Sequence, residues 1–114
     1  MSAPLDAGEI AAGRDNDRIG TRVVLAEAGM RVWHLILRPG ETIPAHRHDR
    51  PYLWTVLTDG KGLARYGDGR IVEHDYKAGE TKCFPDLSPD TAFVHDLTNI
   101  GTTQLTFVTV EFAH

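Results

Sequence analysis

The chain has 114 residues, 41% of them hydrophobic and 25% charged, which fits one ordinary globular domain and leaves no room for a second. Its formal net charge of −4 excludes the concentrated basic surface that nucleic-acid binding requires. No apolar run approaches the roughly 20 residues of a membrane-spanning helix, and the first ten residues lack the basic and apolar regions of a signal peptide.

The N-terminal region differs in composition from the rest of the chain. Residues 1–18 are rich in Ala, Gly and Asp and show no sustained apolar period. We expect a loosely ordered arm there, or a strand added to the sheet of a partner, with one or two helical turns within residues 5–12. Residues 19–114 are expected to form the domain itself.

Short runs rich in β-branched and aromatic residues follow, each about 5–9 residues long, as strands usually are. The runs are 21–25, 30–37, 51–57, 69–74, 91–97 and 104–112. Turn signals such as Pro39-Gly40 and Asp59-Gly60 separate them, because Gly and Asp tolerate the backbone angles of tight turns. Many short strands with Gly-rich turns predict an all-β sandwich or barrel.

The segment His46-Arg47-His48 is the sharpest chemical feature of the sequence. On a strand, side chains two residues apart leave the same face, so both imidazoles would point one way and Arg47 the other. We expect Arg47 to form a structural salt bridge. Two imidazoles on one face are half of a transition-metal site, although the pattern alone equally fits two neighbouring surface histidines.

Two motifs give the sequence a resemblance to the cupin superfamily. The first reads Gly, five residues, His-x-His, an apolar strand and Gly; the second reads Gly, five residues, Pro, a gap, His, three residues and Asn. The matching residues are Gly40, His46, His48 and Gly60 in the first motif and Gly79, Pro85, His95 and Asn99 in the second. Together the motifs cover about residues 31–112. The resemblance implies a small double-stranded β-helix (cupin) barrel.

By this resemblance His46, His48 and His95 would bind one metal ion in the barrel interior. The glutamate ligand of the motif is missing, and either Tyr52 or Leu53 stands in its place, depending on how the following turn is counted. We favour Tyr52, because its hydroxyl can face a wet metal cavity and act as a proton donor. The segment between Pro85 and His95 is longer than usual and could form a lid or one rim of the pocket.

Three neutral imidazoles leave two or three coordination positions open on the metal, and similar ferrous sites occur in cupin dioxygenases. Without a carboxylate ligand the metal keeps more positive charge, which favours an anionic, chelating substrate. We therefore expect a mononuclear metal enzyme acting on a small organic acid or carbonyl compound, with dioxygenation as the leading reaction and iron(II) as the favoured metal.

Two alternatives remain open at this point. Zinc, nickel or manganese in the same ligand set would suit a Lewis-acid isomerase, decarboxylase or lyase. A non-catalytic cupin that binds a metal or small ligand, as a sensor or accessory protein, is the other. Four stretches also resemble the small single-domain cupins associated with β-alanine degradation. They are 15–18, 46–49, 57–60 and 94–96.

Expectations about assembly and location follow from more general features. A small barrel of this kind has exposed sheet edges, which are often protected by pairing with another chain, so we expect a homodimer. The single cysteine, Cys83, excludes an internal disulfide and suits a reducing compartment, so we expect a cytoplasmic location. Outside the motifs, His74 is expected at the surface near a turn.

Overall fold

The computed structural model describes residues 2–113, which form nine β-strands, one α-helix and one 3-10 turn. The strands are β1 (Arg22–Glu27), β2 (Met30–Leu37), β3 (Thr42–His48), β4 (Tyr52–Val56), β5 (Gly60–Arg65), β6 (Ile71–Tyr76), β7 (Thr81–Phe84), β8 (Phe93–Asn99) and β9 (Leu105–Phe112). The helix is α1 (Ala7–Arg14), and the 3-10 turn is η1 (Pro89–Thr91). In this part of the chain, no helix has the length and apolar character needed to cross a membrane.

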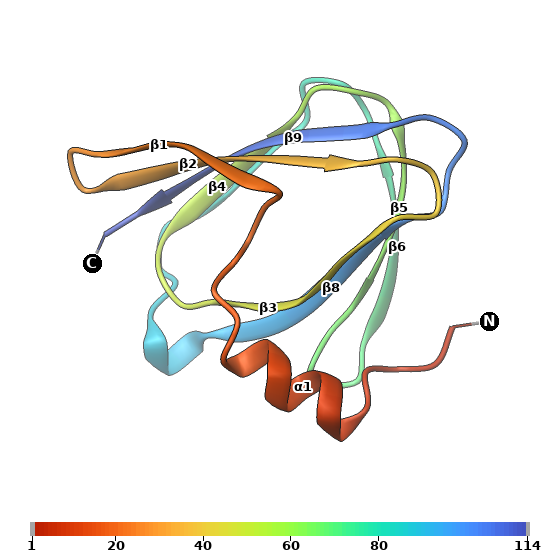
Figure 1. The fold of residues 1–114 in the computed structure, drawn as a ribbon, viewed down its shortest axis with the longest axis horizontal. Helices are drawn as coiled ribbons and strands as arrows, with labels where there is room; N and C mark the ends of the chain where they lie inside the picture. The colour runs from red at the N-terminus through yellow and green to blue at the C-terminus, as the bar shows by residue number, and fades with distance from the viewer. Residues whose placement is uncertain (1, 114) are drawn as a thin grey trace.

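The strands form two antiparallel sheets that face each other (Figure 1). The first sheet has the order β1-β2-β9-β4-β7, and the second has the order β3-β8-β5-β6. The chain passes from one sheet to the other between β2 and β3 and again between β3 and β4, so that successive strands wrap around a common interior. The expected small all-β barrel is thus confirmed.

Two strands, β5 and β7, were not expected from the sequence. The start of β5 reads Gly-Lys-Gly, which indicates a turn when only the sequence is considered. In the structure Gly62 allows two side chains to pack directly against the backbone of β5. A Cβ at this position would lie 2.8 Å from Leu97 Cδ1 and 2.9 Å from Tyr76 Cε2. The strand therefore lacks the side chains that would have revealed it.

The N-terminal region contains the helical turns expected within residues 5–12, as helix α1, but they pack against the barrel and do not form a loose arm. Helix α1 begins with a capping box, in which the Glu9 backbone N–H donates to the Asp6 carboxylate at 2.7 Å and the Asp6 N–H donates to the Glu9 carboxylate at 3.1 Å. The helix packs beneath β3 and β8 (Figure 1). Its closest approach uses Gly13, where a Cβ would lie 2.5 Å from Val94, so the contact leaves no apolar period in the sequence.

The apolar core lies between the two sheets and is continuous with the wall of an interior cavity. Its buried members are Leu35, Leu37, Ile43, Val56, Ala64, Tyr76, Leu97, Leu105 and Phe107. Val56 and Leu105 are fully buried, and burying each such side chain contributes about 1.5–3 kcal/mol. This core fixes the strands that carry the histidines.

Candidate metal centre

Strand β3 presents His46 and His48 to the barrel interior. Both residues are buried, and Arg47 between them points to the outer face, where its Nε donates to Asp49 at 3.1 Å. A β-bulge between Ile43 and His46 shifts the register of β3 by one residue. Because of this bulge, Ile43 and the two histidines all face inward although Ile43 lies three residues before His46.

Strand β8 supplies the third imidazole. His95 stands directly opposite His46 in the β3–β8 register. Because directly paired side chains of neighbouring strands lie on the same face, His95 also points to the barrel interior. The long segment before His95 does not displace it. That segment contains η1 and contributes no residue from 86 to 94 to the lining of the cavity, but its Phe93 ring packs on the rings of His48 and His95, each at 5.1 Å between centroids.

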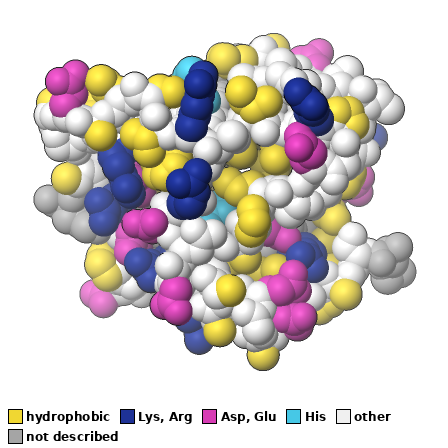
Figure 2. Space-filling view, viewed as in Figure 1, with side chains coloured by type: hydrophobic (Ala, Val, Ile, Leu, Met, Phe, Trp, Pro, Cys, Tyr) yellow, Lys and Arg dark blue, Asp and Glu magenta, His cyan; other side chains and the backbone are white. Residues whose placement is uncertain are grey.

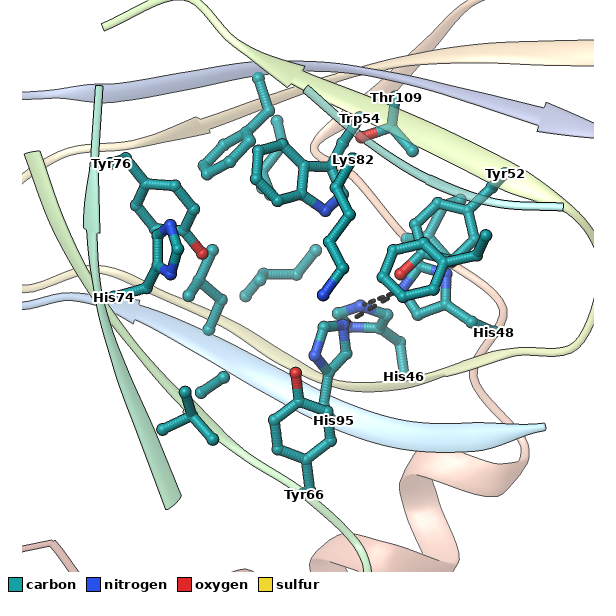
Figure 3. A pocket seen from close by; sticks show the side chains of 18 of the residues that line it. His46, His48, Tyr52, Trp54, Tyr66, His74, Tyr76, Lys82, His95 and Thr109 are labelled. Atoms are coloured by element: carbon teal, nitrogen blue, oxygen red, sulfur yellow. Dashed lines mark hydrogen bonds between the residues drawn. The ribbon is translucent and has the colours of Figure 1, made fainter. Parts of the chain in front are cut away.

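The three imidazoles converge through their Nε2 atoms (Figure 3). The Nε2 of His48 lies 3.1 Å from the Nε2 of His46 and 3.1 Å from the Nε2 of His95. The ring planes are inclined to one another by 67–71°, so the rings radiate from a common point. The structure thus brings together all three histidines that the sequence singled out.

These nitrogens suit a metal ion better than they suit one another. The Nδ1–H of His46 donates to the Pro44 carbonyl at 2.8 Å, which leaves a lone pair on its Nε2. A neutral imidazole carries one N–H, so three facing nitrogens cannot all be satisfied by mutual hydrogen bonds. Two histidine nitrogens bound side by side to one ion at about 2.0–2.1 Å lie about 3 Å apart, close to the observed separation.

Burial keeps the imidazoles in the form that binds metals. It lowers the pKa of His46 from 6.5 to about 4, against smaller opposing effects of the Pro44 carbonyl and the Asp96 carboxylate. Burial also lowers the pKa of His48 and of His95 well below the usual range, helped in both by neighbouring histidine rings. All three rings are therefore neutral at pH 7, as metal coordination requires.

Of the two residues that could replace the motif glutamate, Tyr52 faces the barrel interior and Leu53 does not. Tyr52 is 3% exposed and lines the cavity, whereas Leu53 lies on the opposite face of β4. The Tyr52 ring stacks on His48 at 4.1 Å between centroids and on Phe84 at 4.7 Å. Burial raises the pKa of Tyr52 far above its usual value, so the hydroxyl stays protonated.

The cavity that contains the histidines has a volume of about 270 Å³, near the lower end of the range for small-molecule sites. Its wall is largely aromatic and aliphatic, and Trp54, Tyr66, Tyr76 and Thr109 add polar atoms to it. In the space-filling view, a histidine side chain is visible near the centre of the face, close to Lys or Arg side chains (Figure 2). Of the three clustered histidines, His95 is half-buried and the other two are buried.

Three polar residues of the pocket were missed or misplaced from sequence. His74, expected at the surface, lines the pocket, and its Nε2 lies 2.8 Å from the Glu80 carboxylate. Glu80 and Lys82 line the same wall. The alternation of Glu80, Lys82 and Phe84 after the Gly79 turn was the available signal, but it appears only once β7 is recognised as a strand.

Comparison with known proteins shows similarity in structure. No protein-family model and no curated protein matches the sequence. Among solved structures, a cupin domain from Bordetella pertussis superposes with a TM-score of 0.69 and 22% identity over 82% of this chain and 91% of that one. A conserved Klebsiella pneumoniae protein with a double-stranded β-helix domain has a TM-score of 0.61 and 24% identity over 98% and 90% of the two chains.

A third similar structure is an oxalate oxidase in complex with the substrate analogue glycolate. It matches with a TM-score of 0.55 and 23% identity over 75% of this chain, which spans 42% of the oxidase chain. At these identities the likeness establishes the architecture. The chain has a double-stranded β-helix fold similar to that of solved cupin domains, with a three-histidine cluster that could hold a metal ion.

Proposed function

We propose that the protein is a mononuclear metal-dependent enzyme that acts on a small organic acid or carbonyl compound, with dioxygenation as its reaction. The observation that carries this proposal is the convergence of three histidine Nε2 atoms in a pocket. The Nε2 of His48 lies 3.1 Å from the Nε2 of His46 and 3.1 Å from that of His95. Burial holds these imidazoles neutral, and neutral imidazoles are the commonest protein ligands of transition metals.

In this proposal His46, His48 and His95 hold the metal. When bound, iron(II) would supply open positions for substrate and dioxygen, whereas zinc, nickel or manganese would supply Lewis-acid chemistry. The Pro44 carbonyl fixes the ring orientation of His46. The stacked ring of Tyr52 fixes His48 and excludes water from one side of the site. The protonated Tyr52 hydroxyl is the proposed proton donor to the substrate.

Several observations support an acidic substrate. Among the residues that line the described pocket, Glu80 is the one carboxylate, and it is hydrogen-bonded to His74. The charge of a metal held by three neutral rings is therefore not cancelled by a ligand. A similar solved structure is an oxalate oxidase in complex with the substrate analogue glycolate, a small organic acid, which supports the same substrate class here. The resemblance of four short stretches to cupins associated with β-alanine degradation favours the same substrate class.

The test is elemental analysis of the purified protein, followed by oxygen-uptake measurements with iron(II) restored and a panel of small acids and β-diketones. We expect one metal per chain and substrate-dependent oxygen consumption. Turnover with a redox-inert metal and no oxygen uptake would replace dioxygenation with Lewis-acid catalysis. Stoichiometric metal with no turnover of any panel member would favour a non-catalytic binding protein, and the absence of stoichiometric metal would overturn the proposal.

We further propose that the protein works as a cytoplasmic homodimer that forms through strand β1. This strand is the edge of its sheet, and its Val23, Val24 and Leu25 side chains are 40–42% exposed. In an antiparallel pair of two β1 strands, Arg22 of one copy would face Glu27 of the other, and these apolar residues would be covered. Sedimentation should give twice the 12.6 kDa chain mass at micromolar concentration, and a Leu25→Asp variant should sediment as a single chain.

A further inference from the structure

A lysine, Lys82, lies on the wall of the pocket opposite the β3–β8 pair. Strand β7 is the edge of its sheet and pairs with β4, with Phe84 opposite Tyr52 and Lys82 opposite Trp54. Lys82 and Phe84 line the pocket, and in Figure 3 the Lys82 side chain extends from β7 into it. Cys83 between them is exposed on the other face. The strand therefore aims an ammonium group at the space in front of the histidines.

The charge of this ammonium group is not neutralised by the pocket. Within residues 2–113, no carboxylate lies within 4.0 Å of the Lys82 Nζ. Glu80, two residues away on the same wall, is hydrogen-bonded to His74 at 2.8 Å. Lys82 is exposed overall, and its Nζ lies 5.1 Å from the centre of the Phe84 ring, a cation–π distance that favours holding the ammonium group over the wall of the pocket.

We propose that Lys82 is the specificity residue of this pocket and binds a carboxylate of the substrate whose other end reaches the histidines. The substrate class is then a small molecule with two functional ends, one chelating group and one carboxylate. This inference rests on the proposed function, because it takes the histidine cluster as the place where the chelating end binds.

A single carboxylate fits this wall better than a phosphate does. Lys82 is the one Lys or Arg among the residues that line the described pocket. A lysine offers one compact positive charge, and the lining supplies no arginine fork or second cation that would match the higher charge of a phosphate. The cavity of about 270 Å³ also restricts the ligand to a small molecule. Its aromatic and aliphatic walls suit a short carbon chain between the two polar ends.

The test compares dicarboxylates with monocarboxylates of equal chain length. Malonate, succinate and glutarate are titrated against propionate, butyrate and pentanoate in zinc-loaded protein, with Trp54 fluorescence and calorimetry as readouts. In the wild type we expect at least one dicarboxylate to bind about 10-fold or more tightly than its partner, the scale of a charge-assisted hydrogen bond. Lys82→Met should abolish this preference without weakening the monocarboxylate, and Lys82→Arg should keep most of it.

Matched variants separate Lys82 from a general change in charge. Lys61→Met removes the same charge from an exposed position outside the pocket and should leave the preference unchanged. Glu80→Gln removes the one carboxylate of the wall and should strengthen dicarboxylate binding. Thermal unfolding checks that each variant is folded, and Lys82→Gln serves as a second neutral variant. A Lys82→Met protein that is folded and retains the wild-type preference would overturn the inference, as would a wild type without any preference.

Failure of this inference can be told apart from failure of the proposed function. Metal content is measured on the same samples, and the titrations are repeated on metal-free protein. If the wild type holds no metal, the proposed function fails, and the metal-free titrations then decide on Lys82 alone. If metal is bound at one per chain but Lys82→Met behaves as the wild type, the metal centre stands and the role of Lys82 is rejected.

Discussion

The two faces of the β3–β8 pair differ in whether their buried polar groups have hydrogen-bond partners. His95 and Asp96 are neighbours on β8 and point to opposite sides of the strand. On the outer side, the Asp96 carboxylate accepts from the Arg65 backbone N–H at 2.9 Å, from its Nε at 3.0 Å and from its Nη2 at 2.7 Å. On the inner side, the buried Nδ1 of His95 has no partner within the described chain.

This difference separates a structural polar group from a functional one. Buried polar atoms in folded proteins nearly always find partners, and an exception costs free energy unless a ligand uses it. The outer face follows the rule: Arg65 also donates to Glu9 of α1 at 2.9 Å, so one network joins the helix to β5 and β8. On the inner face the Nε2 atoms of the three histidines, and not the unpartnered Nδ1 of His95, are the nitrogens that face one another and can bind a metal ion.

The largest expected effect concerns the inner face. His95→Ala, His46→Ala or His48→Ala should each abolish stoichiometric metal binding, weakening it by at least about 100-fold, because one of three ligands is lost. In the metal-free protein, His95→Ala should cost less stability than His46→Ala, since the Nδ1 of His95 makes no hydrogen bond that could be lost, whereas the Nδ1–H of His46 donates to the Pro44 carbonyl. Metal titration by calorimetry and urea unfolding measure the two quantities.

The matched control is His74→Ala, which removes an imidazole from the same pocket but not from the cluster. This variant should bind metal as the wild type does. Equal metal affinity in the wild type and the His95→Ala variant would contradict the assignment of His95.

The second prediction concerns the outer face. Asp96 is 1% exposed, and Asp96→Ala would leave the Arg65 guanidinium and backbone N–H without their main acceptor. The Arg65 side chain is 22% exposed and keeps Glu9 as a partner, so the free energy of unfolding in urea should fall by about 1.5–3 kcal/mol, the scale of charged hydrogen bonds. Asp68→Ala is the control, because the Asp68–Arg70 pair is exposed and should contribute about 0–1 kcal/mol. Similar losses in both variants would refute the contrast.

The third prediction is a pH dependence that arises from the inner face. Burial lowers the pKa of His46 from 6.5 to about 4. Between pH 6.5 and pH 4, His46 is therefore protonated in the unfolded chain but not in the folded metal-free protein. The free energy of unfolding should therefore decrease as the pH falls from about 6.5 towards 4, by about 3 kcal/mol for His46. His48 and His95 act in the same direction.

Urea unfolding of metal-free protein at several pH values between 7 and 4 measures this dependence. The His46→Gln variant is the reference, because subtracting its profile removes the contribution of carboxylates elsewhere. The difference between the two profiles should be constant above pH 7 and should change as the pH falls, by about 3 kcal/mol. A constant difference across this range would show that His46 titrates alike in the folded and unfolded states.

The sequence predicted best the parts of the site that depend on alternation along one strand. The inward pair His46 and His48 and the inward position of Tyr52 follow from period-two geometry and motif spacing. Prediction from the sequence failed where the packing contacts are made by glycines, which have no side chain to form a hydrophobic pattern. Gly13 of α1 and Gly62 of β5 touch their neighbours through bare backbone, which no hydrophobic pattern records. Lys82 was missed for a related reason, because β7 is a short edge strand.

The smallest expected effect tests the position where the motif glutamate is missing. Tyr52→Glu would place a carboxylate beside His48, where the Tyr52 ring now stacks at 4.1 Å. The added negative charge should tighten metal binding and weaken binding of an acidic ligand such as succinate, each by about 1–3 kcal/mol, the scale of a charged hydrogen bond. Calorimetric titration of zinc and then of succinate measures both. Tyr52→Phe keeps the stack with Phe84 and removes only the hydroxyl, so it should leave the zinc affinity unchanged. If Tyr52→Glu instead lowers stability while zinc affinity stays constant, the carboxylate does not reach the ion, and Tyr52 serves only as the packing support of His48.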